Sequence, residues 1–87
     1  MEDVEIEQAH INIGKQVAHY RKMNKMSQLD LSLALGHKSV SIVASAERFY
    51  KGKHFNIEHL LKISKILDVP VSAFFEDADM IDSKNAL

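Results

Sequence analysis

Few residues in this chain can interrupt a helix. The 87 residues include three glycines and one proline, whereas a fold of many short strands needs more turn positions. Apolar residues make up 46% of the chain and charged residues 26%, which is typical of a globular domain rather than of a disordered segment. A chain of this length builds one hydrophobic core. We therefore expect a single all-α domain, a small helical bundle.

Apolar spacing and capping residues predict two helices in the first part of the chain. Between residues 11 and 23, apolar side chains recur at steps of three and four, as on one face of a helix. Gly14 lies inside this run, where glycine costs about 1 kcal/mol relative to alanine, so we expect it to permit a close backbone contact. Ser27 and Asp30 have the spacing of a capping box at the start of a second helix. Gly36 stands where a left-handed residue would end that helix.

Three further helices are predicted after Gly36. Ser39 can cap a third helix that runs to about Tyr50, and Asn56 can cap a fourth, "IEHLLKISKIL", at residues 57–67. Pro70 suits the start of a short fifth helix, "VSAFF". The inner face of the fourth helix is predicted to hold Ile57, Leu60, Ile63, Ser64 and Leu67.

The formal net charge of −1 hides an uneven distribution of charges along the chain. Residues 1–9 carry a net charge of −4, residues 10–67 of +7 and residues 68–87 of −4. A basic centre between acidic ends fits a nucleic-acid-binding surface, although a solvated helix face also carries such charges.

The sequence contains no recognisable catalytic or metal-binding pattern. The absence of cysteine excludes disulfides and thiolate metal sites. The chain begins with the acidic stretch "MEDVEIEQ", which is unlike a signal peptide. No window approaches the roughly 20 apolar residues of a membrane span, so we expect a cytoplasmic protein. The acids of the tail, Asp77, Asp79 and Asp82, lack the glycine and final glutamate of a calcium loop. The histidines lack metal-binding spacing and are expected on the surface or in loops: His10, His19, His37, His54 and His59. We expect no cofactor, no metal and no enzymatic activity.

Two short helices joined by a turn that contains glycine describe a helix-turn-helix. The stretches "IGKQVAHYRKMNKMSQLDL", "ALGHKSVSIVASAE" and "NIEHLLKISKILDVPVSAFF" resemble the Xre/Cro-type, phage-repressor-like family of DNA-binding domains over about residues 13–75. The resemblance implies a prokaryotic or phage protein with the five-helix lambda-repressor-like fold. It implies a DNA-binding domain at residues 11–76, with an acidic N-terminal extension at 1–10 and a polar acidic tail at 77–87.

The resemblance also implies a set of DNA-contacting residues. In that family the third helix, here about residues 39–50, lies in the major groove, and the start of the second helix contacts the DNA backbone. Gln28 is implied to bind phosphate and to reach toward a base edge, and Arg21 and Glu47 to form a structural ion pair. The implied DNA-binding residues are Ser27, Gln28, Lys38, Ser39, Val40, Ser41, Ala44, Ser45, Arg48, Lys51, Lys53 and His54.

The predicted third helix lacks the long side chains that usually read bases. Specific base contacts come mostly from Arg, Lys, Gln or Asn, whereas Val40, Ser41 and Ser45 offer a methyl contact to thymine and hydroxyl hydrogen bonds. We therefore expect affinity to come from phosphate contacts, and specificity from Lys38, from Arg48 and from DNA shape.

The function predicted from these features is that of a sequence-specific transcriptional regulator, a repressor that binds a palindromic operator as a homodimer. The alternative is a protein-interaction module, such as an antitoxin or an anti-repressor target. Leu29 and Leu33 lie four residues apart on the outer side of the second helix, where relatives expose polar residues. Either residues 4–11 fold back to cover this pair, or the pair contacts another protein. The candidate dimer surfaces hold Phe74, Phe75 and Met80 near one end, or Val4 and Ile6 near the other.

Overall fold

The computed structural model describes residues 3–78 of the chain, and all regular structure in that range is helical. This confirms the all-α prediction. The fifth predicted helix is present as a 3₁₀ helix, and a second 3₁₀ turn follows the third helix. In chain order the elements are α1 (Asp3–Met23), α2 (Gln28–Ala34), α3 (Ser41–Glu47), η1 (Tyr50–Gly52), α4 (Ile57–Leu67) and η2 (Val71–Phe75). None of the helices in the described range is long and apolar enough to cross a membrane.

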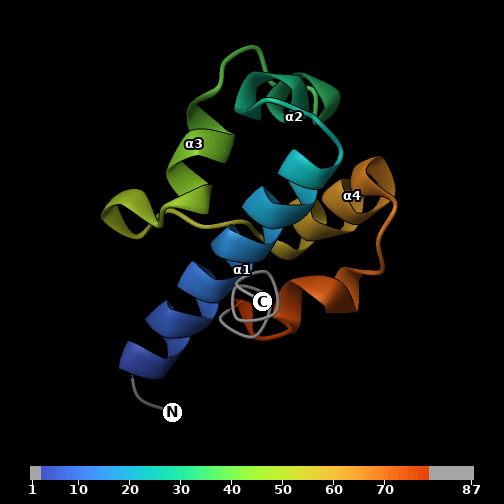
Figure 1. Cartoon of the computed structure of the whole chain (residues 1–87). Helices are drawn as coiled ribbons and strands as arrows, with labels where there is room; N and C mark the ends of the chain where they lie inside the picture. Colours follow the sequence, from blue (N-terminus) through green and yellow to red (C-terminus); the bar gives the residue numbers. More distant parts are fainter. Residues whose placement is uncertain (1–2, 79–87) are drawn as a thin grey trace.

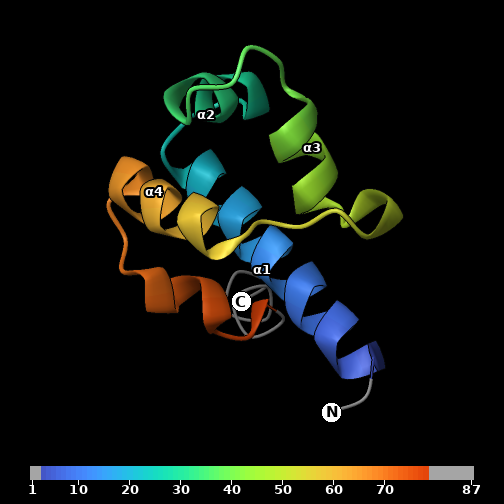
Figure 2. The same cartoon turned by 180° about the vertical axis from the view of Figure 1, so that it is seen from behind.

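The helix α1 forms the centre of the molecule. In Figure 1, α3 lies on one side of α1, α4 and η2 lie on the other, and α2 packs near its C-terminal end. The view from behind in Figure 2 shows the same arrangement, with the N-terminal turns of α1 extending past the remaining helices. The core between these elements consists of Ile13, Val17, Leu31, Leu35, Val43, Ala46, Phe55, Leu60, Ile63, Leu67 and Phe74.

The ends of α2 follow the signals in the sequence. The Ser27 hydroxyl accepts a hydrogen bond from the Asp30 backbone N–H at 2.9 Å, and Asp30 accepts one from the Ser27 N–H at 2.8 Å. At the other end Gly36 has a φ of +93°, and its N–H donates to the carbonyl of Leu33 at 3.0 Å. The N–H of His37 donates to the carbonyl of Ser32, which completes a Schellman motif. The capping prediction is confirmed.

Asn56 caps α4 in the same way, with an unexpected partner. Its side chain accepts a hydrogen bond from the His59 N–H at 2.7 Å, while the Asn56 N–H donates to Nδ1 of His59 at 3.2 Å. Burial, and then the positive charge of His37, lower the pKa of His59 and so favour the neutral ring that can accept this bond. A histidine at this position thus does the work of the usual glutamate or glutamine.

The first helix is longer than predicted. We expected it to begin near residue 11, but α1 begins at Asp3, so the predicted domain boundary at residue 10 lies inside a helix. No glycine or proline interrupts residues 3–13, and Asp3 and Glu5 interact favourably with the positive end of the helix dipole. Residues 4–11 therefore do not fold back over α2. Leu29 and Leu33 are 46% and 55% exposed, so the prediction that this segment covers them is wrong.

The third helix is shorter than predicted at both ends. It begins at Ser41 with Val40 as its N-cap, and Ser39 is not a cap: its hydroxyl lies 2.8 Å from that of Ser41. The helix ends at Glu47 rather than near Tyr50, because Phe49 adopts a left-handed backbone conformation with a φ of +54°.

Two side chains differ from their predicted environment. Leu60, Ile63 and Leu67 of α4 are buried as predicted, but Ile57 is 70% exposed because the buried stripe is centred on those three residues. Phe74, predicted as part of a dimer surface, is fully buried in the core, whereas its neighbour Phe75 is 57% exposed. Met80 lies outside the described residues.

Close contacts fix α3 and the C-terminal segment against α1. A Cβ atom on Gly14 would lie 2.6 Å from the carbonyl oxygen of Glu47, which confirms the predicted close approach of two backbones. On another side of α1, the side-chain amides of Asn12 and Gln16 donate to the carbonyl of Glu76 at 2.8 and 2.7 Å. The N–H of Ala78 donates to Oδ1 of Asn12 at 2.8 Å. These bonds hold η2 in place and keep Phe74 in the core.

Candidate nucleic-acid interface

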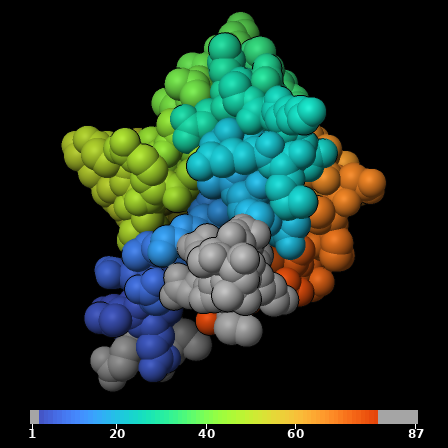
Figure 3. Space-filling view, viewed as in Figure 1, coloured from blue at the N-terminus to red at the C-terminus, as the bar shows by residue number. Residues whose placement is uncertain are grey.

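The residues implied to contact DNA lie on three consecutive parts of the structure. Ser27 and Gln28 stand at the start of α2, residues 38–41 form the turn and the start of α3, and residues 48–54 follow its end. Figure 3 shows the last part as a lobe that protrudes beside α1. The helix α3 has seven residues and is about 10 Å long at 1.5 Å per residue. The residues at its start, 38–41, and those after it, 48–54, are therefore separated by only this helix.

The residues implied to contact DNA differ in their exposure to solvent. Lys38, Ser39, Val40 and Ser41 are exposed at the start of α3. Ala44 and Ser45 are half-buried and offer less surface to a partner than the turn does. Arg48, Lys51, Lys53 and His54 are exposed at the other end.

A buried ion pair holds α3 against α1. Nε of Arg21 donates to Oε2 of Glu47 at 2.7 Å, and Nη2 donates to Oε1 at 3.1 Å, while the two residues are 7% and 9% exposed. A third donor of the guanidinium, Nη1, bonds the carbonyl of Met26 at 2.9 Å. This bidentate geometry agrees with the structural role expected for the pair.

Gln28 forms a bond within the protein that the sequence did not indicate. It donates from Nε2 to Oε1 of Glu47 at 2.9 Å. The carboxylate of Glu47 thus receives donors from α1 and α2 at once. In this structure Gln28 joins α2 to α3, which gives the two helices a fixed relative orientation.

The turn after α3 gathers positive charge around an aromatic ring. The guanidinium carbon of Arg48 lies 5.2 Å from the centre of the Tyr50 ring, and Nζ of Lys51 lies 5.4 Å from it. Both distances are within the range of a cation–π interaction. The sequence predicted Tyr50 only as the end of the third helix, and in the structure its side chain is 45% exposed. The stretch "RFYKGK" has basic residues on both sides of Tyr50, and this pattern indicates a ring surrounded by cations.

A stack of rings connects this turn to α1. The rings of His10 and His54 are 3.8 Å apart between centroids and 22° from parallel, and Phe49 stacks beside them at 6.0 Å from His10. Nδ1 of His54 is also 3.0 Å from the carbonyl of Gly52. Burial, and then the charge of His54, lower the pKa of His10 and favour its neutral form. No sequence pattern indicated this contact, because the two histidines are 44 residues apart.

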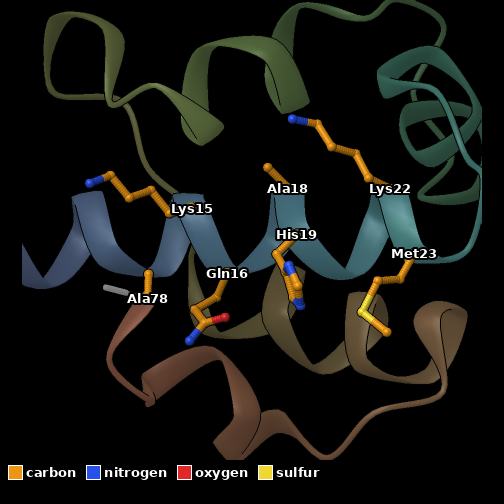
Figure 4. Close-up of a pocket in the computed structure, with 7 residues that line it drawn as sticks. All are labelled: Lys15, Gln16, Ala18, His19, Lys22, Met23 and Ala78. Atoms are coloured by element: carbon orange, nitrogen blue, oxygen red, sulfur yellow. The ribbon is translucent and has the colours of Figure 1, made fainter. Parts of the chain in front are cut away.

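A separate hollow lies along α1. It encloses about 530 Å³ and is lined by Lys15, Gln16, Ala18, His19, Lys22, Met23 and Ala78. Figure 4 shows Gln16, His19 and Met23 on one side of the helix and Lys15, Ala18 and Lys22 on the other. None of the residues implied to bind DNA lines this hollow, so it is distinct from the candidate interface.

Within residues 3–78, no group of three or more His, Cys, Asp or Glu side chains is placed to hold a metal ion.

Comparison with known proteins gives no family: no family model, curated protein or solved structure matches this chain.

Proposed function

We propose that this protein is a sequence-specific DNA-binding transcriptional regulator, a repressor that binds a palindromic operator as a homodimer. The observation that supports the proposal most directly is how α3 is held and which charges lie around it. This helix is locked to α1 and α2 by the Arg21–Glu47–Gln28 bonds, and exposed cations stand at both of its ends. A rigid helix between two basic segments can enter a groove while its flanks bind the phosphates on either side.

The fold supports the same proposal. Two short helices, α2 and α3, are joined by a turn that contains Gly36, which supports a helix-turn-helix in this proposal, with η2 in the role of the fifth helix. In this proposal the turn and the start of α3 enter the major groove. Lys38 donates to guanine acceptors, Val40 contacts a thymine methyl group, and Ser41 forms a hydroxyl hydrogen bond. Lys51 and Lys53, with Arg48 beside Tyr50, bind backbone phosphates.

The first test is selection of bound fragments from random DNA at physiological salt. A palindromic consensus with two half-sites about one helical turn apart, roughly 34 Å, is the expected result. Uniform weak binding to all fragments would contradict specific recognition and leave only charge-driven affinity.

Salt dependence tests the phosphate-binding role of the turn. The logarithm of affinity falls with the logarithm of salt concentration, and each lost phosphate contact reduces the magnitude of this slope by about 0.9. The double variant Lys51→Gln with Lys53→Gln is therefore expected to reduce it by about 1.8. The matched control is Lys62→Gln with Lys65→Gln, which removes the same charge from exposed positions on α4. Equal losses from the two double variants would show that binding depends on net charge and not on this turn.

The exposure of Leu29 and Leu33 favours a second function, a protein-interaction module of the antitoxin or anti-repressor-target kind. Two neighbouring large aliphatic side chains on one exposed helix face form an apolar surface of the kind that a protein partner can cover. Co-purification of a stoichiometric partner that is lost in the double variant Leu29→Ser with Leu33→Ser would support it. Unchanged DNA selection by that variant would show that the two functions use different surfaces.

A further inference from the structure

The hollow along α1 lies between two rows of side chains. Each row follows the helical spacing of three and four residues, so each runs along one line of the helix surface. One row carries two lysines, and the other carries an amide, an imidazole and a thioether (Figure 4). The rows are Lys15, Ala18 and Lys22, and Gln16, His19 and Met23. The hollow encloses about 530 Å³, which is the size of a small-molecule site. We call it the α1 hollow.

Two side-chain amides of α1 bond the C-terminal segment alike but differ at their oxygen atoms. Asn12 and Gln16 both donate to the carbonyl of Glu76, at 2.8 and 2.7 Å. The Asn12 oxygen accepts a hydrogen bond from the N–H of Ala78, so both ends of that amide are bonded. Gln16 is 0% exposed, and its Oε1 is buried without a hydrogen-bond partner in the described part of the chain. One amide is therefore satisfied and the other lacks a donor.

The carbonyl of Glu76 fixes the orientation of the Gln16 amide. A carbonyl oxygen only accepts hydrogen bonds, so Nε2 must face it, and turning the amide over would place two acceptors together. Figure 4 shows the Gln16 oxygen on the side of His19, along the row that lines the hollow. A buried acceptor without a donor is destabilising, so a ligand that supplies an N–H or O–H at this point gains affinity.

The charge of the α1 hollow limits what this ligand can be. Lys15 and Lys22 form part of one row, and none of the described lining residues is an aspartate or a glutamate. Such a lining attracts anions and disfavours a cationic donor such as an ammonium group. The donor that bonds Gln16 must then be a neutral hydroxyl or amide.

We propose that the α1 hollow binds a small organic anion that carries a neutral hydroxyl or amide donor. The anionic group lies along the lysine row, the donor bonds Oε1 of Gln16, and the rest of the ligand contacts Ala18 and Met23. Hydroxycarboxylates and phosphate monoesters with a free hydroxyl share this chemistry. None of the residues implied to bind DNA lines the hollow, so the inference does not depend on the proposed function.

Heteronuclear NMR titrations of the full chain with matched anions test the inference without DNA. Mandelate and phenylacetate differ only in a hydroxyl group, and glycerol phosphate and propyl phosphate make the same comparison for a phosphate. Saturable shifts are expected at the amides of residues 15–23. In one of the pairs the anion with the hydroxyl is expected to bind about 10-fold tighter, as for a donor that satisfies a buried acceptor. The pair that shows this preference identifies the anionic group.

Variants assign the preference to particular side chains. Gln16→Met is similar in size and removes the acceptor, so it is expected to bind both members of a pair equally. Asn12→Met is the matched control, because it also removes bonds to the C-terminal segment but leaves Oε1 of Gln16 in place. Lys22→Gln is expected to weaken both members by about 3-fold, whereas Lys25→Gln, outside the hollow, should not. Circular dichroism melts check that each variant is folded.

Three results would overturn the inference. The first is the absence of saturable binding by either pair at millimolar concentrations. The second is equal affinity within both pairs in the wild type, or a preference that Gln16→Met retains, because the buried acceptor then plays no part. The third is a set of shifts confined to residues 48–54, where the anions would bind as phosphate mimics. If Gln16→Met does not fold, the wild-type preference and the Lys22→Gln variant still decide. Selection of DNA fragments is a separate measurement, so failure of either proposal leaves the other standing.

Discussion

The helix α3 and the turn that follows it are held in different ways. Polar groups fix α2 and α3: the capping box of Ser27 and Asp30, the Schellman motif at Gly36, and the bonds that converge on Glu47 at the end of α3. The turn after Glu47 has left-handed residues at Phe49 and Lys51. That turn is held mainly by the rings of His10, Phe49 and His54.

This difference implies that α3 keeps a fixed orientation, whereas the turn after it adjusts. Buried charge-assisted hydrogen bonds are directional, so the α2–α3 pair keeps one geometry. Ring contacts are less directional than these bonds, and the turn remains largely exposed, so we expect it to shift more readily than α3. If the protein binds DNA as proposed, α3 would determine the register and the turn would adapt to the phosphates.

Loss of the Arg21 side chain should have the largest effect on the α2–α3 pair. Arg21→Met leaves the Glu47 carboxylate buried with only Gln28 as a partner, and an unpaired buried charge costs about 3–5 kcal/mol. Urea denaturation is expected to show this loss of unfolding free energy, and Lys22→Met, at the exposed neighbouring position, is the control. Replacing Glu47 by leucine in the same chain should restore most of the stability. If it does not, the two residues do not act as a pair.

Gly14→Ala should have the next largest effect, because it separates α1 from the end of α3. The added Cβ would meet the backbone carbonyl of Glu47 at 2.6 Å, and a carbonyl oxygen cannot turn aside as a side chain can. We expect a net destabilisation of about 1–3 kcal/mol, despite the better helix propensity of alanine. Glu7→Ala, at an exposed position of the same helix, should change the free energy of unfolding by less than about 0.5 kcal/mol. Equal or higher stability of Gly14→Ala would show that α3 can move away at little cost.

Sequence reasoning located the elements where a short-range signal exists. Ser27, Gly36 and Asn56 marked helix ends correctly, because each cap depends on residues within a few positions. Gly14 was identified as a close contact, because glycine inside a helix has a cost that needs a compensating reason. The Arg21–Glu47 pair came from the family resemblance and is present in the structure.

The remaining features depend on distant residues or on the absence of a signal. His10 and His54 meet only in the folded chain, and nothing in their local sequence distinguishes them from surface histidines. Ser39 looked like a helix cap, but the backbone continues as a turn to Val40. Phe74 and Phe75 are adjacent and identical in type, and only the packing of η2 on α1 and α4 decides which one is buried.

Ser27→Ala should weaken the start of α2 moderately. Loss of the hydroxyl that caps the Asp30 N–H is expected to cost about 1 kcal/mol in urea denaturation. Ser72→Ala removes an exposed hydroxyl from η2 and should have no measurable effect. The hydrogen bonds from Ser27, the backbone one first, hold the pKa of Asp30 below its usual value. Their contribution is present at neutral pH and is lost as the pH falls through the folded-state pKa. Ser27→Ala keeps the backbone N–H, so it should remove only the smaller, side-chain part of this acid sensitivity.

The smallest expected effect is a pH dependence on the ring-stacked side. In the unfolded chain His10 takes up a proton near pH 6.5, whereas in the folded protein burial and the charge of His54 hold its pKa lower. The unfolded state therefore binds more protons below that pH, and stability present above about pH 6.5 is lost as the pH falls. His10→Phe keeps a ring on His54 and removes the titrating group, while His59, whose pKa is also lowered, stays in both proteins. Urea denaturation across this pH range should show a smaller loss of stability in the variant than in the wild type. Identical losses would mean that the stack tolerates a protonated His10, and that the turn is held by Phe49 and the backbone instead.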